Sequence, residues 1–170
     1  LKKYHRSLIE SGEYWRQSMT RFDVQSRVDS TLMSNLRIMR RMLINQISKR
    51  CDTSKETITG VVHALLNRSI FIKYLEERKD SNGKTVFPQD FYCNFMKSAK
   101  QYTDVLNSKE ATYNLFRTLK EKFNGDTLQV SEIEAEIITQ DDLDELRTFI
   151  LGDSELESKQ LTLWPLYSFD

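Results

Sequence analysis

The sequence predicts a mainly α-helical fold, in which several helices form a bundle around one central apolar helix and at most one short hairpin interrupts them. Apolar residues recur every three or four positions along several stretches, and helix-start and helix-stop signals separate these stretches. Glycine and proline are scarce, with five and two among 170 residues. The composition, 39% hydrophobic and 29% charged, is that of a globular chain that buries a core.

The first two predicted elements are an N-terminal arm and a long amphipathic helix. Residues 1–25 predict a short helix followed by a packed irregular arm. From about Ser26 to Ser48, apolar residues recur with the 3.6-residue period of a helix that buries one face. These residues are Val28, Leu32, Leu36, Met39, Leu43 and Ile47.

A second long helix should begin after Asp52, because Thr53 can cap it while Glu56 reaches back to the cap. Apolar residues then cover almost the whole helix, as expected of a helix at the centre of a bundle. We expect it to end near Lys79, before the turn signal Asn82-Gly83. The expected buried face is Ile58, Val61, Val62, Leu65, Ser69, Ile72 and Leu75, widened by Leu66, Ile70, Phe71 and Tyr74.

Weaker signals mark the later elements. Pro88 suits the first turn of a short helix. Asn107 with Glu110 is a capping pattern that predicts the start of a further helix. Asn124-Gly125 would end that helix in a left-handed conformation. Residues 132–136 alternate acidic and apolar side chains, which fits either a short strand or one helical turn. Thr139 with Asp142 should cap a last helix, closed by Gly152.

The domain organisation expected from these elements is an arm (1–25), a helical connector domain (26–152) and a linker (153–170). The chain begins at Leu1 rather than Met and ends in an apolar, aromatic run, residues 164–170. Natural termini are usually polar. We therefore expect a segment of a longer protein, with a further domain covering that run.

The charge balance excludes a chain that coats nucleic acid as a polycation, because the formal net charge is zero. Residues 1–80 hold 16 basic and 9 acidic side chains, and residues 81–170 hold 9 and 16. Cys51 and Cys93 are too few for a structural zinc site and suit reduced thiols. Because neither a membrane-length apolar run nor a signal peptide is visible, we expect a cytoplasmic protein with no membrane partner.

The sequence offers no residue to which catalysis, cofactor binding or metal binding can be assigned. The five glycines are isolated, so no glycine-rich loop could approach a nucleotide-type ligand. His5 and His63 are the only histidines, and we expect His63 to be a partly buried, hydrogen-bonded helix residue rather than a ligand or base. The carboxylates Asp141, Asp142, Asp144 and Glu145 are expected to be helix-start charges.

One basic cluster is a candidate for contact with the DNA backbone. Phosphate contact by basic side chains gives a salt-dependent, sequence-independent affinity. A solvated or ion-paired face is the alternative. Around the central helix, we expect Arg68, Glu76, Glu77 and Arg78 to pack their stems and pair their heads. The candidate contacts are Arg37, Arg40, Arg41, Lys49 and Arg50.

Residues 62–78 (VHALLNRSIFIKYLEER) resemble a segment that precedes the catalytic domain in bacterial adenine-specific DNA methyltransferases of restriction–modification systems, including fused nuclease–methyltransferases. Residues 115–126 are similar to the next helix of that family and its stop, and residues 160–170 to the approach to the catalytic domain. With residues 27–29 and the helix after them, the resemblance covers most of the chain.

The resemblance implies a non-catalytic helical connector that packs on its own methyltransferase domain and touches double-stranded DNA, in a parent protein that uses S-adenosylmethionine. The donor-binding loop and the Pro-Pro-containing catalytic tetrapeptide of that family are both absent here. Methyl transfer is thus an expectation for the parent protein alone.

Two alternatives remain at this point. Residues 47–68 have the look of a helix-turn-helix, with Asn82-Gly83 at the tip of a winged-helix hairpin, which would make a DNA-binding regulator. Residues 70–75 do not alternate as a half-buried strand should, which favours a continuous helix. The other alternative is a helical protein-interaction module without nucleic acid.

Overall fold

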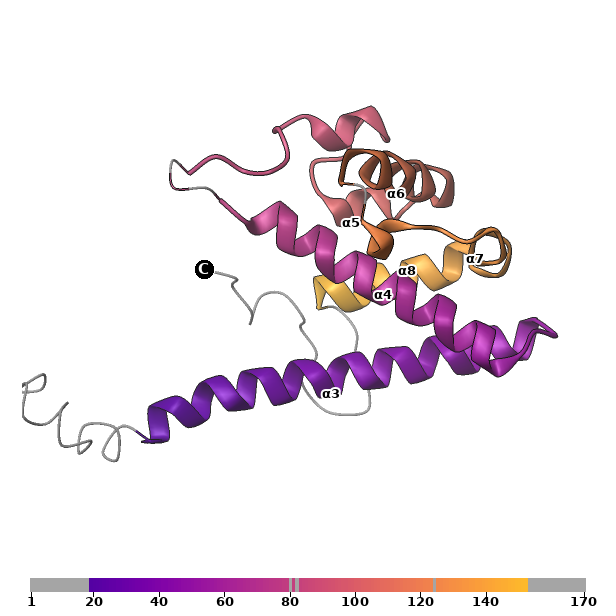
Figure 1. The fold of residues 1–170 in the computed structure, drawn as a ribbon, viewed down its shortest axis with the longest axis horizontal. Coiled ribbons are helices and arrows are strands. Elements are labelled where there is room, and N and C mark those ends of the chain that lie inside the picture. Colours follow the sequence, from indigo (N-terminus) through magenta and orange to yellow (C-terminus); the bar gives the residue numbers. More distant parts are fainter. Residues whose placement is uncertain (1–18, 80, 82, 124, 153–170) are drawn as a thin grey trace, which may run out of the picture. The chain divides into compact units, whose positions relative to one another are not determined.

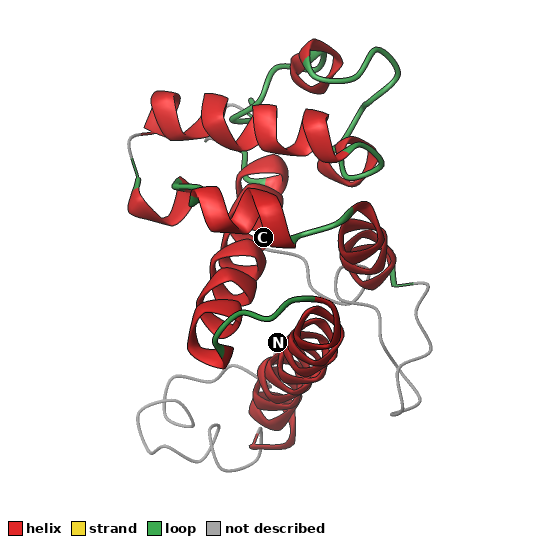
Figure 2. Ribbon diagram, turned by 90° about the vertical axis from the view of Figure 1, so that its right-hand side faces the viewer, coloured by secondary structure: helices red, strands yellow, loops and turns green. Residues whose placement is uncertain are grey.

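The computed structural model describes residues 19–79, 81, 83–123 and 125–152, and their side chains from residue 32 onward. Every regular element in this part is helical, which confirms the predicted mainly α fold (Figures 1 and 2). The predicted linker 153–170 and most of the predicted arm lie outside the described residues. The elements are α3 (Met19–Arg50), α4 (Lys55–Glu77), η2 (Phe91–Asn94), α5 (Tyr102–Val105), α6 (Lys109–Phe123), η3 (Asp126–Leu128), α7 (Glu132–Ile137) and α8 (Gln140–Leu151).

Two compact units divide the chain, residues 1–36 and residues 37–170. In the first unit the structure describes the beginning of α3, which starts at Met19 rather than near Ser26. Part of the predicted arm is therefore helical. The second unit contains the rest of α3 and all later elements, and it is the unit in which the candidate sites lie.

Helix α4 is the apolar centre of the second unit. Its N-cap is Ser54, whose Oγ accepts a hydrogen bond from the Thr57 N–H at 3.1 Å, so the predicted cap at Thr53 was wrong by one residue. The helix runs unbroken to Glu77 and contacts α5 and η3. All seven residues of the expected face are buried, as are Leu66, Arg68 and Lys73, whereas Ile70, Phe71 and Tyr74 are half-buried.

The short elements between α4 and α6 differ in detail from the prediction. The segment after Pro88 forms one 3₁₀ turn, η2, and the only contact that resembles the predicted hairpin is an antiparallel bridge between Lys79 and Thr85, within the described residues. Ser108, not Asn107, accepts from the N–H of Ala111 at the start of α6. The Ser108 hydroxyl is one residue closer than the Asn107 side chain to the first backbone N–H groups of the helix, which have no partner within the helix.

The stop of α6 was also mispredicted. Gly125 is extended, with φ −95°, so it does not form the predicted left-handed stop, and Asn124 lies outside the described residues. The acidic stretch after it is helical: Ser131 caps α7 through the Glu134 N–H. The start and end of α8 are as predicted, with a Thr139–Asp142 capping box and Gly152 left-handed at φ 84°.

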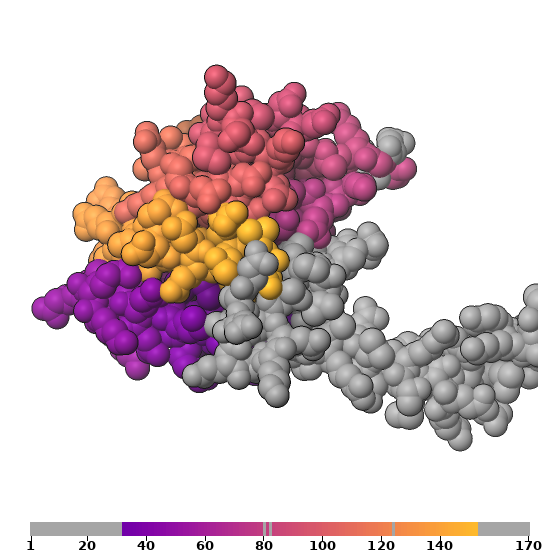
Figure 3. All heavy atoms as spheres, turned by 180° about the vertical axis from the view of Figure 1, so that it is seen from behind, coloured from indigo at the N-terminus to yellow at the C-terminus, as the bar shows by residue number. Residues whose placement is uncertain are grey.

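Within the second unit, α8 packs on the last turns of α3. Met39, Leu43 and Ile47 form a buried seam of α3, each at most 1% exposed. Figure 3 shows α8 lying directly against this part of α3. The Gln46 amide donates to the Glu145 carboxylate at 2.8 Å, which fixes the register of the two helices.

Candidate functional site

The structure separates the five basic residues of the predicted DNA contact into three groups. Arg37, Arg41 and Lys49 are exposed on α3. Arg40 is half-buried, and its Nε is buried without a hydrogen-bond partner among the described residues. Arg50 is exposed as a residue, but its guanidinium binds within the protein.

Arg50 forms a fork with Asp142, the capping residue of α8. Its two terminal nitrogens lie 2.6 and 3.2 Å from the two carboxylate oxygens, and one also lies 3.4 Å from the carbonyl oxygen of Ile137. Asp142 is completely buried and also accepts from the backbone N–H and hydroxyl of Thr139. The hydrogen bond to Asp142 raises the pKa of Arg50 above its ordinary value. This carboxylate therefore ties the end of α3 to the start of α8.

A second ion pair lies in the core and connects α4 to α7. Arg68 and Glu134 are 0% and 1% exposed, and their shortest N···O distance is 2.6 Å. The same guanidinium donates to the Gln129 carbonyl at 2.6 Å and lies over the Phe116 ring at 4.5 Å. Arg68 was expected to pack and pair, which the structure confirms. Its partner Glu134 was not anticipated.

Tyrosines surround this ion pair and the middle of α4. Tyr102 exchanges a hydrogen bond with Ser69 at 2.8 Å, and the Tyr113 hydroxyl donates to the Glu134 carbonyl at 3.4 Å. Desolvation by burial raises the pKa of Tyr102, Tyr113 and Tyr92 well above the ordinary value of tyrosine. All three hydroxyls stay protonated at neutral pH, and those of Tyr102 and Tyr113 form structural hydrogen bonds.

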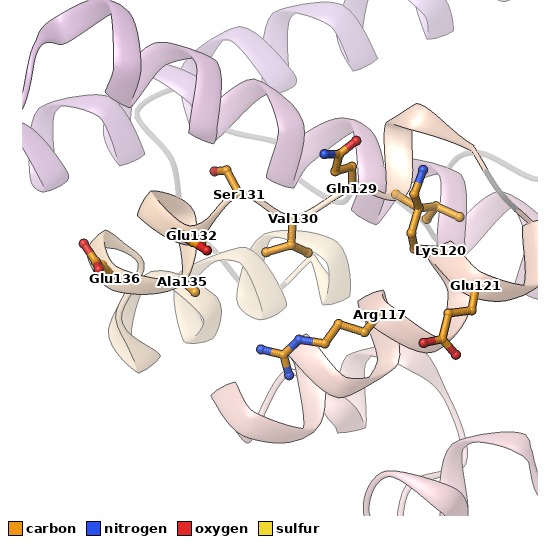
Figure 4. Close-up of a pocket in the computed structure, with 10 residues that line it drawn as sticks. Arg117, Lys120, Glu121, Gln129, Val130, Ser131, Glu132, Ala135 and Glu136 are labelled. Carbon is orange, nitrogen blue, oxygen red and sulfur yellow. The ribbon is translucent and has the colours of Figure 1, made fainter.

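An open groove of about 700 Å³ runs between α6 and residues 128–136 (Figure 4). Arg117 and Lys120 line it from α6, and Glu132 and Glu136 line it from α7. Val130 points into the space between them. A second hollow of about 390 Å³ shares Arg117 and Ala135 with the first and continues along α6. The mixed charges do not favour a phosphate or any other single class of small ion.

The remaining candidates for chemistry do not assemble into a reactive centre in the described part of the chain. His63 is exposed, so the expectation of a partly buried histidine was wrong: its position on α4 faces solvent between buried neighbours. No group of three or more potential metal ligands occurs among the described residues. Cys51 and Cys93 are both free. None of the described helices has the length and apolarity needed to cross a membrane.

No family model, no curated protein and no solved structure matches this chain.

Proposed function

We propose that this chain is the helical scaffold of a bacterial adenine-specific DNA methyltransferase of a restriction–modification system. In this proposal it carries no reaction of its own. It supports a catalytic domain that binds S-adenosylmethionine, and it presents a basic helix to double-stranded DNA. The proposal rests on the sequence resemblance of residues 62–78 to such proteins.

The observation that supports it best is the unbroken course of α4 (Lys55–Glu77), which contains residues 62–77. A connector of this kind must keep a fixed shape between two neighbours. Helix α4 is held by buried polar links at two levels, Arg68 with Glu134 and Ser69 with Tyr102. Buried polar groups that pair across helices favour one rigid arrangement of the helices around them.

The winged-helix alternative required a strand after the second helix. Residues 70–75 are helical in α4, and the bridge between Lys79 and Thr85 is a single pair outside any strand. The interaction-module alternative differs from the proposal because it predicts no salt-dependent binding of DNA.

The experiment is a methyl-transfer assay on the complete protein that contains this chain. We expect transfer of labelled methyl groups from S-adenosylmethionine to the exocyclic amine of adenine in duplex DNA, identified by mass spectrometry of the nucleosides. Deleting residues 37–152 should abolish transfer while the deleted protein still binds the donor. A complete protein that transfers no methyl group, and that lacks a donor loop and a Pro-Pro tetrapeptide beyond these residues, would overturn the proposal.

A further inference from the structure

The exposed side of α3 in the second unit carries a regular row of polar side chains. Arg37, Arg41, Asn45 and Lys49 follow one another at intervals of four residues, and all four are exposed. Each step of four residues rises about 6 Å and turns about 40° around the helix, so the row spans about 18 Å on one side. We call these four residues the α3 row.

The α3 row lies opposite the buried seam of the same helix. Met39, Leu43 and Ile47 are offset from it by two residues, which is about 200° around a helix. Because the seam packs inside the unit, the row points away from that core. Its arginines and lysine are therefore positioned for a partner outside the second unit.

Helix stability alone does not account for the row. Arg37 and Arg41 are like charges at i and i+4, an arrangement that disfavours a helix. No acidic residue occurs between positions 31 and 51 to offset them. The helix dipole favours cations in the last turn only, so it explains Lys49 but neither arginine.

Resting on the proposed function, we infer that the α3 row is the contact surface for the phosphate backbone of duplex DNA, and that Arg50 is excluded from it. Arg37, Arg41 and Lys49 neutralise phosphates, while the Asn45 amide adds a neutral donor. Arg50 instead holds Asp142, a buried carboxylate that would be left without its cation if the guanidinium turned outward.

Duplex DNA is favoured over a single strand because nothing in the row can stack on bases. Residues 32–50 contain no aromatic side chain, whereas proteins that hold single strands combine a basic groove with aromatic platforms. Backbone contact without base contact gives an affinity that depends on salt and not on sequence.

The test measures binding of the 170-residue chain to a labelled 20-base-pair duplex by fluorescence anisotropy at several KCl concentrations. Three phosphate contacts predict a slope of log K against log [salt] of about −2.7, which is about a 40-fold loss between 50 and 200 mM. R37Q/R41Q should reduce the slope to about −0.9 and K49Q to about −1.8. N45A should leave the slope unchanged and weaken binding about two- to tenfold.

Two matched variants serve as controls. R50Q should keep the wild-type slope and lower the melting temperature, because Arg50 acts on α8 rather than on DNA. R117Q removes an exposed arginine from the groove on α6 and should change neither the slope nor the affinity. Circular dichroism verifies the helix content of every variant.

Three results would overturn the inference. They are a wild-type salt slope near zero, a slope that R37Q/R41Q leaves unchanged, and a reduction of the slope by R50Q as large as that by K49Q. Equal or tighter binding of a 20-nucleotide thymidine strand would overturn the choice of duplex DNA. The proposed function fails separately, when the complete protein transfers no methyl group and lacks both the donor loop and the Pro-Pro tetrapeptide, so each failure is recognised on its own.

Discussion

Removing the charge of Glu134 should destabilise the protein strongly, because Arg68 would then be a buried cation without its counterion. Both side chains are essentially inaccessible to solvent, and the carboxylate receives hydrogen bonds from both terminal nitrogens of the guanidinium, at 2.6 and 3.2 Å. Breaking one partner of such a pair costs roughly 3–5 kcal/mol. Because domains of this size are stable by about 5–15 kcal/mol, Glu134→Gln should lose a large share of the total.

The assay is urea unfolding followed by circular dichroism at pH 7, in low and in high salt. The loss of unfolding free energy caused by Glu134→Gln should be nearly the same at both salt concentrations, since salt screens a buried pair weakly. Should Glu134→Gln unfold the chain, the paired replacement Arg68→Met with Glu134→Leu keeps the test possible. It removes both charges, leaves none unpaired, and should be close to neutral.

The matched control is Asp126→Asn, which breaks the pair between Lys120 and a fully exposed carboxylate at 4.0 Å. It should have no measurable effect. A loss below about 1 kcal/mol for Glu134→Gln, or a strong salt dependence of that loss, would refute the reasoning that burial makes this pair indispensable.

Four further predictions concern two glycines, one helix cap and three buried tyrosines. Gly60→Ala should stabilise the protein by about 1 kcal/mol, because Gly60 is an exposed residue within α4 with open space around an added Cβ. Gly152→Ala should destabilise it by about 1–2 kcal/mol, because Gly152 has φ 84°. The urea midpoint should therefore shift upward for the first variant and downward for the second. Thr139→Ala should lower the free energy of unfolding by about 0.5–2 kcal/mol through the lost cap of α8. A loss no larger than that of Thr118→Ala, at an exposed position of α6, would contradict it. The free energy of unfolding should fall as pH rises above about 10, because Tyr92, Tyr102 and Tyr113 keep their protons in the folded state while the same tyrosines ionise in the unfolded state. Equal free energies of unfolding at pH 8 and pH 11 would contradict the raised pKa values.

Local sequence patterns determined the helices and several of their ends. The apolar period predicted α3 and α4, and the Thr139–Asp142 pair predicted both the start of α8 and its capping box. These features depend on residues three or four positions apart, which the helix itself brings together. Errors of one residue at Ser54 and Ser108 arose where two neighbouring polar side chains could both serve as caps.

Only the tertiary structure decided which charges are available at the surface. Nothing in the sequence distinguishes Arg50 from its neighbour Lys49, or Arg68 from Arg78. In the structure Arg50 is bound by the carboxylate of Asp142, 92 residues away, and Arg68 by that of Glu134, 66 residues away. Packing of the helices also decides that His63 is exposed while Leu65, two residues later on the same helix, is buried. Pairings at such separations depend on how whole helices pack, and no pattern within one helix encodes them.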